Sequence, residues 1–262
     1  MAVKLEGDCM VRKMREGIPT VSGTLAVWHQ IGREIGAEAI SLRILEFAPG
    51  LSPGILNEDC DEVLYFLETW DGTECELRRV TVFIDGWSYE VAPPAGIYLR
   101  PGQTLTINNP GSEQVVFVSS QCPEPRSDVE FLDSLTSPKA GSVEADRLPI
   151  VRLADRETIP TADRWYRVLV DDAVGSLQVT QFVGSIPPGR APDHFHTYEE
   201  VLFILRGRGR MWAGDSRTSI GPGSCVYLPK RQVHCVENTG EDELRLIGVF
   251  YPAGSPSVRY ET

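Results

Sequence analysis

The stretch IPPGRAPDHFHTYEEVLFIL, residues 186–205, has a counterpart earlier in the same chain. APGLSPGILNEDCDEVLYFL, residues 48–67, aligns on it without a gap. Farther along each half, IYLRPGQTLTINNPG (97–111) aligns on VYLPKRQVHCVENTG (226–240). Two copies of one unit in the same order predict that the chain contains a duplicated domain.

Both copies consist of short apolar runs separated by turn signals rich in Gly, Pro and Asn, such as GIYLRPG and SLQVTQFVG. Many short strands at even spacing predict an all-β sandwich or barrel. We therefore expect an N-terminal domain over residues 20–121 and a C-terminal domain over residues 159–256. The segment between them, 122–158, is richer in Pro, Ser and charge, and we interpret it as a linker with room for a short helix.

The amino-acid composition limits the classes of protein to which this chain can belong. With 262 residues, 42% hydrophobic and 24% charged, the chain is typical of globular proteins and long enough for two domains. A formal net charge of −12 argues against a nucleic-acid or anionic-membrane surface. No apolar run approaches the ~18–20 residues of a membrane span, and the first residues lack the apolar core of a secretory signal. We therefore expect a cytoplasmic protein whose six cysteines are free thiols.

Three of the chain's four histidines lie in the second copy. On an extended strand His194, His196 and Glu200 project to one face, and His234 adds a third imidazole from another predicted strand. An HxH pair or a strand histidine is often incidental, but three imidazoles and a carboxylate together suit one divalent transition metal ion: Fe, Mn, Ni, Cu, Co or Zn. A six-coordinate ion would keep two positions for water, dioxygen or a chelating substrate.

These residues carry a resemblance to a known family. Their spacing resembles the two cupin motifs, the first one residue short in its opening spacer: Gly189-(x4)-His194-x-His196-(x3)-Glu200-(x6)-Gly207 and Gly223-(x5)-Pro229-(x4)-His234-(x3)-Asn238. One further departure is Arg231, where the second motif usually has glycine. The resemblance implies a jelly-roll β-barrel with the four ligands in its interior. Together with the repeat it implies a bicupin, most similar to type-2 and quercetin-dioxygenase-like cupins.

The first copy departs from this pattern. In the gap-free alignment Leu56, Glu58 and Leu105 stand at the three histidine positions, and only the carboxylate remains, as Glu62. Leucine cannot ligate a metal, so we expect the N-terminal barrel to be metal-free. The acidic run 58–62 lacks the spaced oxygen ligands and turn glycine of a calcium loop, and a solvated acidic turn is the favoured interpretation.

The family hosts several chemistries. We expect a metal-dependent enzyme that acts on a small oxygen-rich molecule, most simply a dioxygenase-type oxidoreductase. A metal-dependent isomerase or lyase and a non-catalytic binding bicupin stay open as alternatives. Glu200 is either a metal ligand or a general base, and His29 matches neither motif and is interpreted as structural. The apolar strand 201–205 suits packing against another sheet or subunit, which allows a homodimer. Candidate pocket residues, each also explicable as ordinary core, are Gln181, Phe182, Met211, Trp212, Tyr227 and Phe250.

Overall fold

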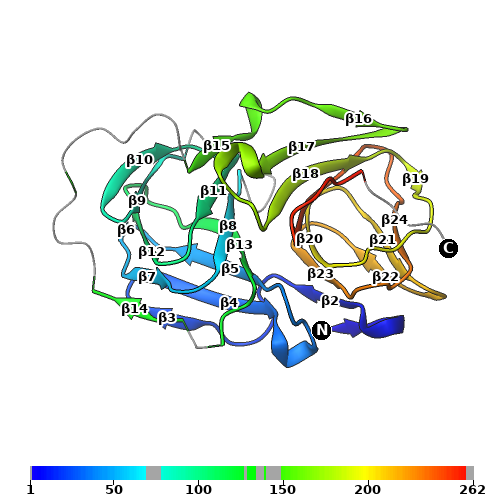
Figure 1. The fold of residues 1–262 in the computed structure, drawn as a ribbon, viewed down its shortest axis with the longest axis horizontal. Helices are drawn as coiled ribbons and strands as arrows, with labels where there is room; N and C mark the ends of the chain where they lie inside the picture. The colour runs from blue at the N-terminus through cyan, green and yellow to red at the C-terminus, as the bar shows by residue number, and fades with distance from the viewer. Residues whose placement is uncertain (1, 69–77, 127–128, 134–138, 140–148, 258–262) are drawn as a thin grey trace.

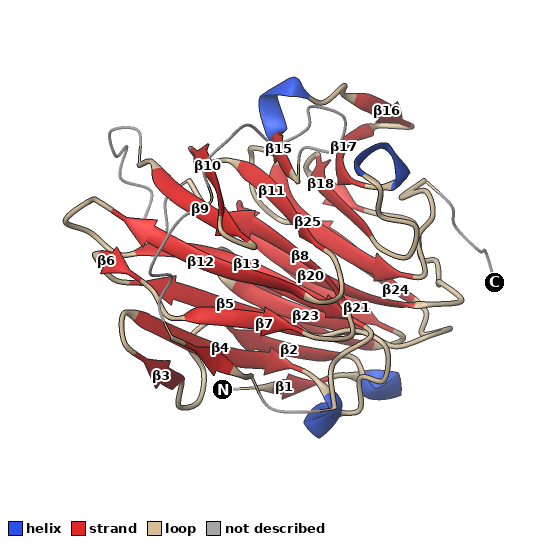
Figure 2. Ribbon diagram, turned by 60° about the vertical axis from the view of Figure 1, so that its left-hand side comes forward, coloured by secondary structure: helices blue, strands red, loops and turns tan. Residues whose placement is uncertain are grey.

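The computed structural model describes residues 2–68, 78–126, 129–133, 139 and 149–257. Within these residues strands dominate, and the helical elements are single 3-10 turns at the edges of the molecule (Figure 2). Two β-barrels lie side by side (Figure 1), so the predicted all-β fold with two tandem jelly-roll domains is confirmed. The 3-10 turns are η1 (Glu6–Asp8), η2 (Arg33–Ile35), η4 (Leu153–Asp155) and η5 (Asp172–Val174).

The N-terminal barrel consists of a seven-stranded and a six-stranded sheet. The larger sheet has the order β15-β11-β8-β13-β5-β4-β3: β3 (Thr20–Ser22), β4 (Leu25–Ile31), β5 (Leu42–Phe47), β8 (Asp61–Phe66), β11 (Ala95–Leu99), β13 (Val115–Cys122) and β15 (Ile150–Arg152). The smaller sheet contains β6 (Gly50–Leu51), β7 (Gly54–Asn57), β9 (Val80–Ile84), β10 (Trp87–Val91), β12 (Gln103–Asn109) and β14 (Phe131–Leu132). Apolar side chains from both sheets fill the interior, as expected for facing sheets.

The C-terminal barrel repeats this plan with an eight-stranded and a four-stranded sheet. The larger sheet has the order β1-β2-β23-β20-β25-β18-β17-β16: β1 (Val3–Lys4), β2 (Met10–Lys13), β16 (Ile159–Thr161), β17 (Arg164–Val170), β18 (Thr180–Ile186), β20 (Glu199–Arg206), β23 (Ser224–Leu228) and β25 (Leu244–Tyr251). The smaller sheet contains β19 (Gly189–Arg190), β21 (Gly209–Ala213), β22 (Ser216–Ile220) and β24 (His234–Asn238).

The two barrels exchange edge strands. Near the N-terminus β2 pairs with β23 of the C-terminal barrel, and β15, from the segment expected to be a linker, pairs with β11 of the N-terminal barrel. That segment also supplies β14, which pairs with β7. Each barrel therefore uses residues outside the ranges 20–121 and 159–256, and the described part of the linker contributes strands as well as the short turn η4.

The large sheets of the two barrels pack against each other, and strand β20 shows how. Leu202 and Ile204 face the interior of the C-terminal barrel, whereas Val201 and Phe203 join a core shared with the other barrel. Alternate side chains of one strand thus serve two cores, because successive residues point to opposite faces. The apolar character of both faces, which the sequence associated with a second sheet or subunit, is explained by the second barrel of the same chain.

Glu199 is a buried carboxylate at this interface. It accepts hydrogen bonds from the backbone N–H groups of Glu38 and Ala39, at 3.1 and 2.7 Å, and from the Tyr227 hydroxyl at 3.1 Å. The first two donors belong to the N-terminal half and the third to the C-terminal barrel. Glu199 therefore links the two halves of the chain by hydrogen bonds. The N-terminal barrel has a corresponding carboxylate–tyrosine pair, in which the Tyr98 hydroxyl donates to the buried Asp61 at 2.5 Å.

We expect Glu199→Ala to lower the free energy of unfolding by about 2–3 kcal/mol, because two backbone N–H groups and a hydroxyl lose a charged acceptor. Tyr227→Phe removes one of these bonds and should cost about 1 kcal/mol. Denaturant unfolding followed by tryptophan fluorescence measures both values. Equal stability of Glu199→Ala and wild type would show that the contact contributes nothing.

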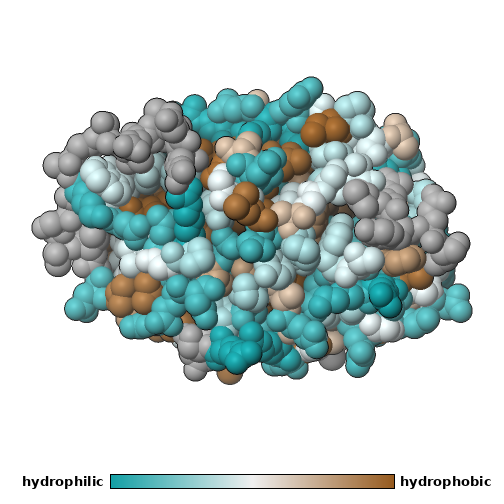
Figure 3. Space-filling model, in the orientation of Figure 1, coloured by the Kyte–Doolittle hydropathy of each residue, from teal (hydrophilic) through white to brown (hydrophobic). Residues whose placement is uncertain are grey.

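The face shown in Figure 3 is mainly hydrophilic, with apolar residues in scattered spots. Among the described residues the large exposed apolar side chains are Val3, Ile18, Val21, Leu51 and Leu177. No helix in the described part of the chain is both long and apolar enough to span a membrane.

Candidate metal centre

Two neighbouring segments bring the three predicted histidines together. His194 and His196 lie on the chain entering β20, and His234 is the first residue of β24. The backbones of His194 and His234 exchange two hydrogen bonds, with N···O distances of 3.1 and 2.8 Å. This antiparallel bridge fixes the spacing of the two imidazoles independently of any ion.

The three imidazoles converge. One nitrogen from each of His194, His196 and His234 lies within 4.8 Å of the other two, close enough for a single ion to contact all three. Two rings are oriented through their second nitrogen: His194 Nδ1 lies 3.0 Å from the Pro192 carbonyl and His234 Nδ1 lies 2.8 Å from the Gln232 carbonyl. Such carbonyl partners fix the tautomer in which Nε2 carries the lone pair that binds metal.

Glu200 completes the set of donors. Its Oε2 lies 3.3 Å from His196 Nε2, and both side chains are over 90% buried. Burial opposes ionisation, but the hydrogen bond to His196 and the electrostatic interactions with the three histidines hold the pKa of Glu200 below its usual value. Burial and the neighbouring His194 lower the pKa of His234 to about 4. At neutral pH these residues thus offer an ionised carboxylate and a neutral imidazole, which are the forms that bind a metal.

His196 is held by stacking. Its ring lies parallel to Tyr198, with centroids 4.9 Å apart, and Tyr198 in turn stacks on Phe250 at 4.8 Å. Its Nδ1 is buried and has no hydrogen-bond partner among the residues that the structure describes, so packing supplies the orientation that carbonyl groups supply to the other two rings. A chain of aromatic rings from the barrel interior therefore positions the third imidazole.

The turn before His234 explains the departure at Arg231. This residue adopts φ = 63°, in the left-handed region that glycine enters without cost. Its backbone N–H donates to the His196 carbonyl at 2.6 Å, which links the two ligand-bearing segments. The turn thus keeps the geometry of a glycine turn although the residue is arginine, and the ligand set is unchanged.

A cavity of about 110 Å³ opens beside the metal ligands. Most of its walls are apolar or aromatic, and Arg164 adds a cation that sequence reasoning missed. The lining residues that matter below are Arg164, Trp165, Tyr166, Phe182, Ile186 and Leu246. Of the pocket candidates named from the sequence, Phe182 lines this cavity. Met211 and Phe250 belong to the barrel core, and Tyr227 belongs to the interdomain contact.

In the N-terminal barrel the positions that correspond to His194 and His234 hold no histidine. Strand pairing sets Ile55 opposite Leu105 there, just as His194 stands opposite His234, so the gap-free alignment through Leu56 is wrong by one residue at this point. Ile55 and Leu105 are both buried in the apolar core. Among the described residues, the three histidines of the other barrel form the single cluster of three potential metal ligands. That the N-terminal barrel holds no metal remains a prediction.

The acidic run of the first copy does not form a solvated turn throughout. Glu58 and Asp59 are exposed, but Asp61 and Glu62 are buried. Glu62 accepts from the Arg43 guanidinium at 2.5 Å and from the Ser119 hydroxyl at 2.6 Å. Sequence reasoning missed Arg43, whose only signal was a charged residue inside the apolar strand SLRILEF.

Comparison with known proteins gives a family match for this region. The model of the family described as "Cupin domain" matches residues 182–250. An uncharacterised protein of Aquifex aeolicus is 30% identical over 86 residues, which cover 32% of this chain and 69% of the relative. The auxin-binding protein T92 of Nicotiana tabacum is 32% identical over 80 residues, covering 26% of this chain and 43% of the relative. An uncharacterised protein of Methanocaldococcus jannaschii is 33% identical over 57 residues, 22% of this chain and 46% of the relative. The chain thus spans about half of the length of several curated relatives.

Solved structures match over both barrels. A deletion mutant of Bacillus subtilis oxalate decarboxylase has a TM-score of 0.71 at 15% identity, covering 92% of this chain and 76% of that one. A structure of the same enzyme in work on its Mn(II) centres has a TM-score of 0.71 at 16% identity, covering 94% and 78%. At this level of identity the likeness establishes the two-barrel fold.

Proposed function

We propose that this chain, which belongs to the cupin superfamily as a bicupin, is a metal-dependent enzyme of the dioxygenase type that acts on a small oxygen-rich molecule in its C-terminal barrel. The observation that carries the proposal is the convergence of three imidazoles and Glu200 beside a mainly apolar cavity. Such a donor set suits a divalent transition metal ion such as Fe, Mn, Ni, Cu, Co or Zn.

The cavity walls favour a substrate with an apolar body. Phe182, Ile186 and Leu246 line the cavity together with Trp165 and Tyr166. Apolar walls bind planar or aliphatic groups and exclude water, while a few polar groups fix the orientation. A molecule with adjacent oxygen atoms at one end and an apolar ring at the other satisfies both parts of the site, which is why we favour an enediol or flavonol-like substrate.

Each polar residue then has a task. The three histidines and Glu200 would hold the ion, which when bound supplies a Lewis acid and, for a redox-active metal, a means of activating dioxygen. Glu200 would also accept the proton of a substrate hydroxyl, because its carboxylate is buried and ionised beside His196. The apolar walls would keep bulk water from the reacting atoms.

Arg164 provides a test of substrate orientation. Arg164 lines the cavity, and its Nε donates to Asp163 at 2.9 Å. A guanidinium has two further nitrogens with which it could bind an anionic or strongly polar substrate group. We expect Arg164→Leu to raise KM about 10–100-fold, a loss of about 1.4–2.8 kcal/mol of binding, while metal content stays at the wild-type value. Arg217→Leu, at an exposed arginine of β22 in the same barrel that packs over Trp212 rather than over a cavity residue, is the matched control. Unchanged kinetics in Arg164→Leu would remove the residue from the site.

A second candidate reaction is decarboxylation or another lyase reaction. Arg164 favours it, because a guanidinium is a suitable partner for a substrate carboxylate. Oxalate decarboxylases share the two-barrel fold. The mainly apolar cavity argues for a carboxylate substrate larger than oxalate.

One experiment separates these reactions. The protein is loaded with each of the six metals in turn, and oxygen uptake and carbon dioxide release are measured with enediols, flavonols and small carboxylates. Oxygen uptake that needs both metal and substrate supports the dioxygenase proposal. Carbon dioxide release without oxygen uptake supports the lyase. A substrate-dependent rise in Tm with no turnover for any pair would identify a binding protein and contradict an enzymatic function.

A further inference from the structure

Gly248 of β25 faces the interior of the C-terminal barrel without a side chain. Phe250, two residues farther along the same strand, belongs to the interior core, and alternate residues of a strand share a face. Gly248 pairs with Phe182 of β18 on one side and with Leu202 of β20 on the other. In the same ladder Phe250 pairs with Glu200. Gly248 therefore lies one interior layer away from the glutamate of the metal centre.

The ring of Phe182 occupies the place that a side chain at position 248 would take. A Cβ atom added to Gly248 would lie 2.2 Å from both Cε1 and Cζ of Phe182. Carbon atoms pack at about 3.5–4.0 Å, so the ring lies directly against the backbone of β25. Any residue other than glycine would require the ring or the strand to move.

The same ring forms part of the wall of the cavity beside the metal ligands. Phe182 lines this cavity of about 110 Å³ together with Gly184, and a Cβ added to Gly184 would lie 3.3 Å from Cε2 of the ring. On other sides the ring packs near Tyr166 and Phe250, with centroids 6.3 and 6.1 Å away. A ring displaced from Gly248 would therefore enter the cavity, which is the open space that borders it.

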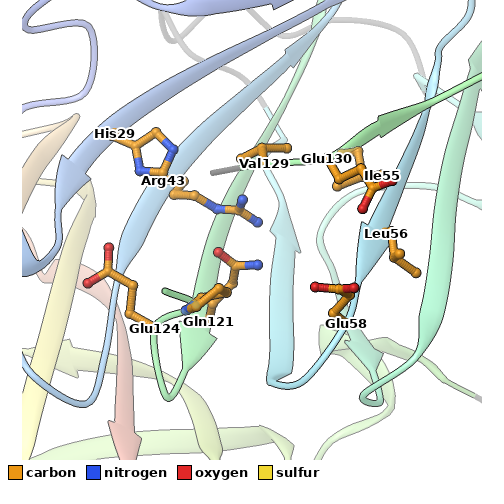
Figure 4. A pocket seen from close by; sticks show the side chains of 10 residues that line it. His29, Arg43, Ile55, Leu56, Glu58, Gln121, Glu124, Val129 and Glu130 are labelled. Atoms are coloured by element: carbon orange, nitrogen blue, oxygen red, sulfur yellow. The ribbon is translucent and has the colours of Figure 1, made fainter. Parts of the chain in front are cut away.

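The N-terminal barrel shows the alternative arrangement. Its strand register pairs Arg43 with Ser119 as Phe182 pairs with Gly248, so a residue with a side chain replaces the glycine. Arg43 donates to the Ser119 hydroxyl at 3.0 Å and to Glu62, the counterpart of the metal-site glutamate, at 2.5 Å. A long side chain at this position thus reaches the glutamate. The cavity that Arg43 lines there has a volume of about 40 Å³ (Figure 4).

We propose that Gly248 is a specificity-determining residue, which keeps Phe182 against β25 and so leaves room beside the metal ligands for a catechol-type chelator, an aromatic ring with two adjacent oxygen atoms. The inference rests on the proposed function, because it assigns the substrate class of the same site. An apolar cavity of about 150 Å³ holds a benzene molecule, and the cavity of about 110 Å³ is of that order. A cavity reduced to the 40 Å³ of the other barrel would admit only a ringless chelator such as oxalate.

The test is calorimetry on zinc-loaded protein under argon, with catechol and oxalate as probes. Zinc has no redox chemistry, so the bound ion does not oxidise catechol. We expect Gly248→Ala to bind catechol about tenfold more weakly than the wild type and to bind zinc and oxalate as the wild type does. The double variant Gly248→Ala/Phe182→Leu lacks the two clashing ring carbons and should regain catechol affinity to within about threefold. A merely structural role of Gly248 would weaken both probes alike and would not be rescued.

Two further measurements keep the proposal testable if Gly248→Ala binds no zinc or does not fold. Phe182→Leu alone, with Gly248 intact, should bind the larger chelator 2,3-dihydroxynaphthalene about tenfold more tightly than the wild type. No gain would show that Phe182 does not limit the size of the ring. A crystal structure of metal-free Gly248→Ala should show the Phe182 ring turned into the cavity. A ring that stays in place while β25 moves would overturn the proposal.

Failure of this inference differs from failure of the proposed function. Equal catechol affinity of the wild type and Gly248→Ala would overturn the role of Gly248 and leave a working metal site. A wild type that holds no zinc, or holds zinc and binds neither probe, would overturn the proposed function. In that case the crystal structure of the variant would still decide where the Phe182 ring lies.

Discussion

His196→Ala is expected to yield a folded chain that retains no transition metal and has no turnover, whereas the wild type holds about one ion per chain. His196 is one of the three converging imidazoles, and its Nε2 also contacts Glu200. Its loss removes a ligand and leaves Glu200 without its nearest hydrogen-bond partner. Metal content is measured by mass spectrometry on tag-free protein after metal reconstitution.

His29→Ala is the matched control for this variant. His29 is the one histidine outside the motifs and lies in the N-terminal barrel, where it lines a small cavity together with Arg43. Its replacement should leave the metal content at the wild-type value. A metal-free His196→Ala protein with full activity would disprove metal-dependent catalysis. Little metal in the reconstituted wild type would show that the four ligands no longer form a working site.

The metal centre could be predicted from the sequence because its residues obey local rules. The spacing of His194, His196 and Glu200 in the sequence predicted that they share a face, and the motif spacing placed His234 on a neighbouring strand. In the structure the two histidines lie just before β20 and Glu200 lies within it. The structure brings these residues together through the paired backbones of His194 and His234. What the sequence could not supply was the cavity beside them. Arg164 comes from β17 on another part of the sheet, and its approach depends on barrel closure rather than on any local pattern.

The N-terminal barrel was harder to predict, for two physical reasons. The gap-free alignment carries Leu56 to the place of His194, but the ladder pairs Ile55 with Leu105, so the offset between the copies changes by one residue before Glu62. Alignment by residue type cannot detect such a shift when neighbouring residues are both apolar. The partner of Glu62 was also hidden, because Arg43 lies 19 positions away on another strand.

The contacts between the two barrels also could not be predicted from the sequence alone. The acidic pair Glu199 and Glu200 appears uniform in the sequence, but strand parity sends Glu200 to the metal site and Glu199 to the other barrel. A division of the sequence into two domains and a linker also could not predict that β2 pairs with β23 and β15 with β11. These pairings depend on which sheet edge is free after folding. Dimer formation remains a prediction, and the interface already uses one outer face of each barrel.

The largest effect on stability is expected at the ion pair of the N-terminal barrel. Glu62→Ala should lower the free energy of unfolding by about 3–5 kcal/mol, because it leaves a buried guanidinium without its counter-charge. Arg43 and Glu62 are 0% and 1% exposed and 2.5 Å apart, so water cannot take the place of the lost carboxylate. Denaturant unfolding of metal-free protein measures the change without a contribution from the other barrel's ion.

The double variant Arg43→Met/Glu62→Leu tests whether the ion pair stabilises the barrel more than two apolar side chains would, or whether only the loss of one partner is destabilising. Replacing both members of a buried pair with apolar residues is often neutral, or stabilising by about 1–4 kcal/mol. We expect the double variant to recover most of the loss seen in Glu62→Ala, since it leaves no buried charge without its partner and the other barrel holds an apolar residue, Phe182, at the position of Arg43. A double variant as unstable as Glu62→Ala would mean that the ion pair itself holds the strands together.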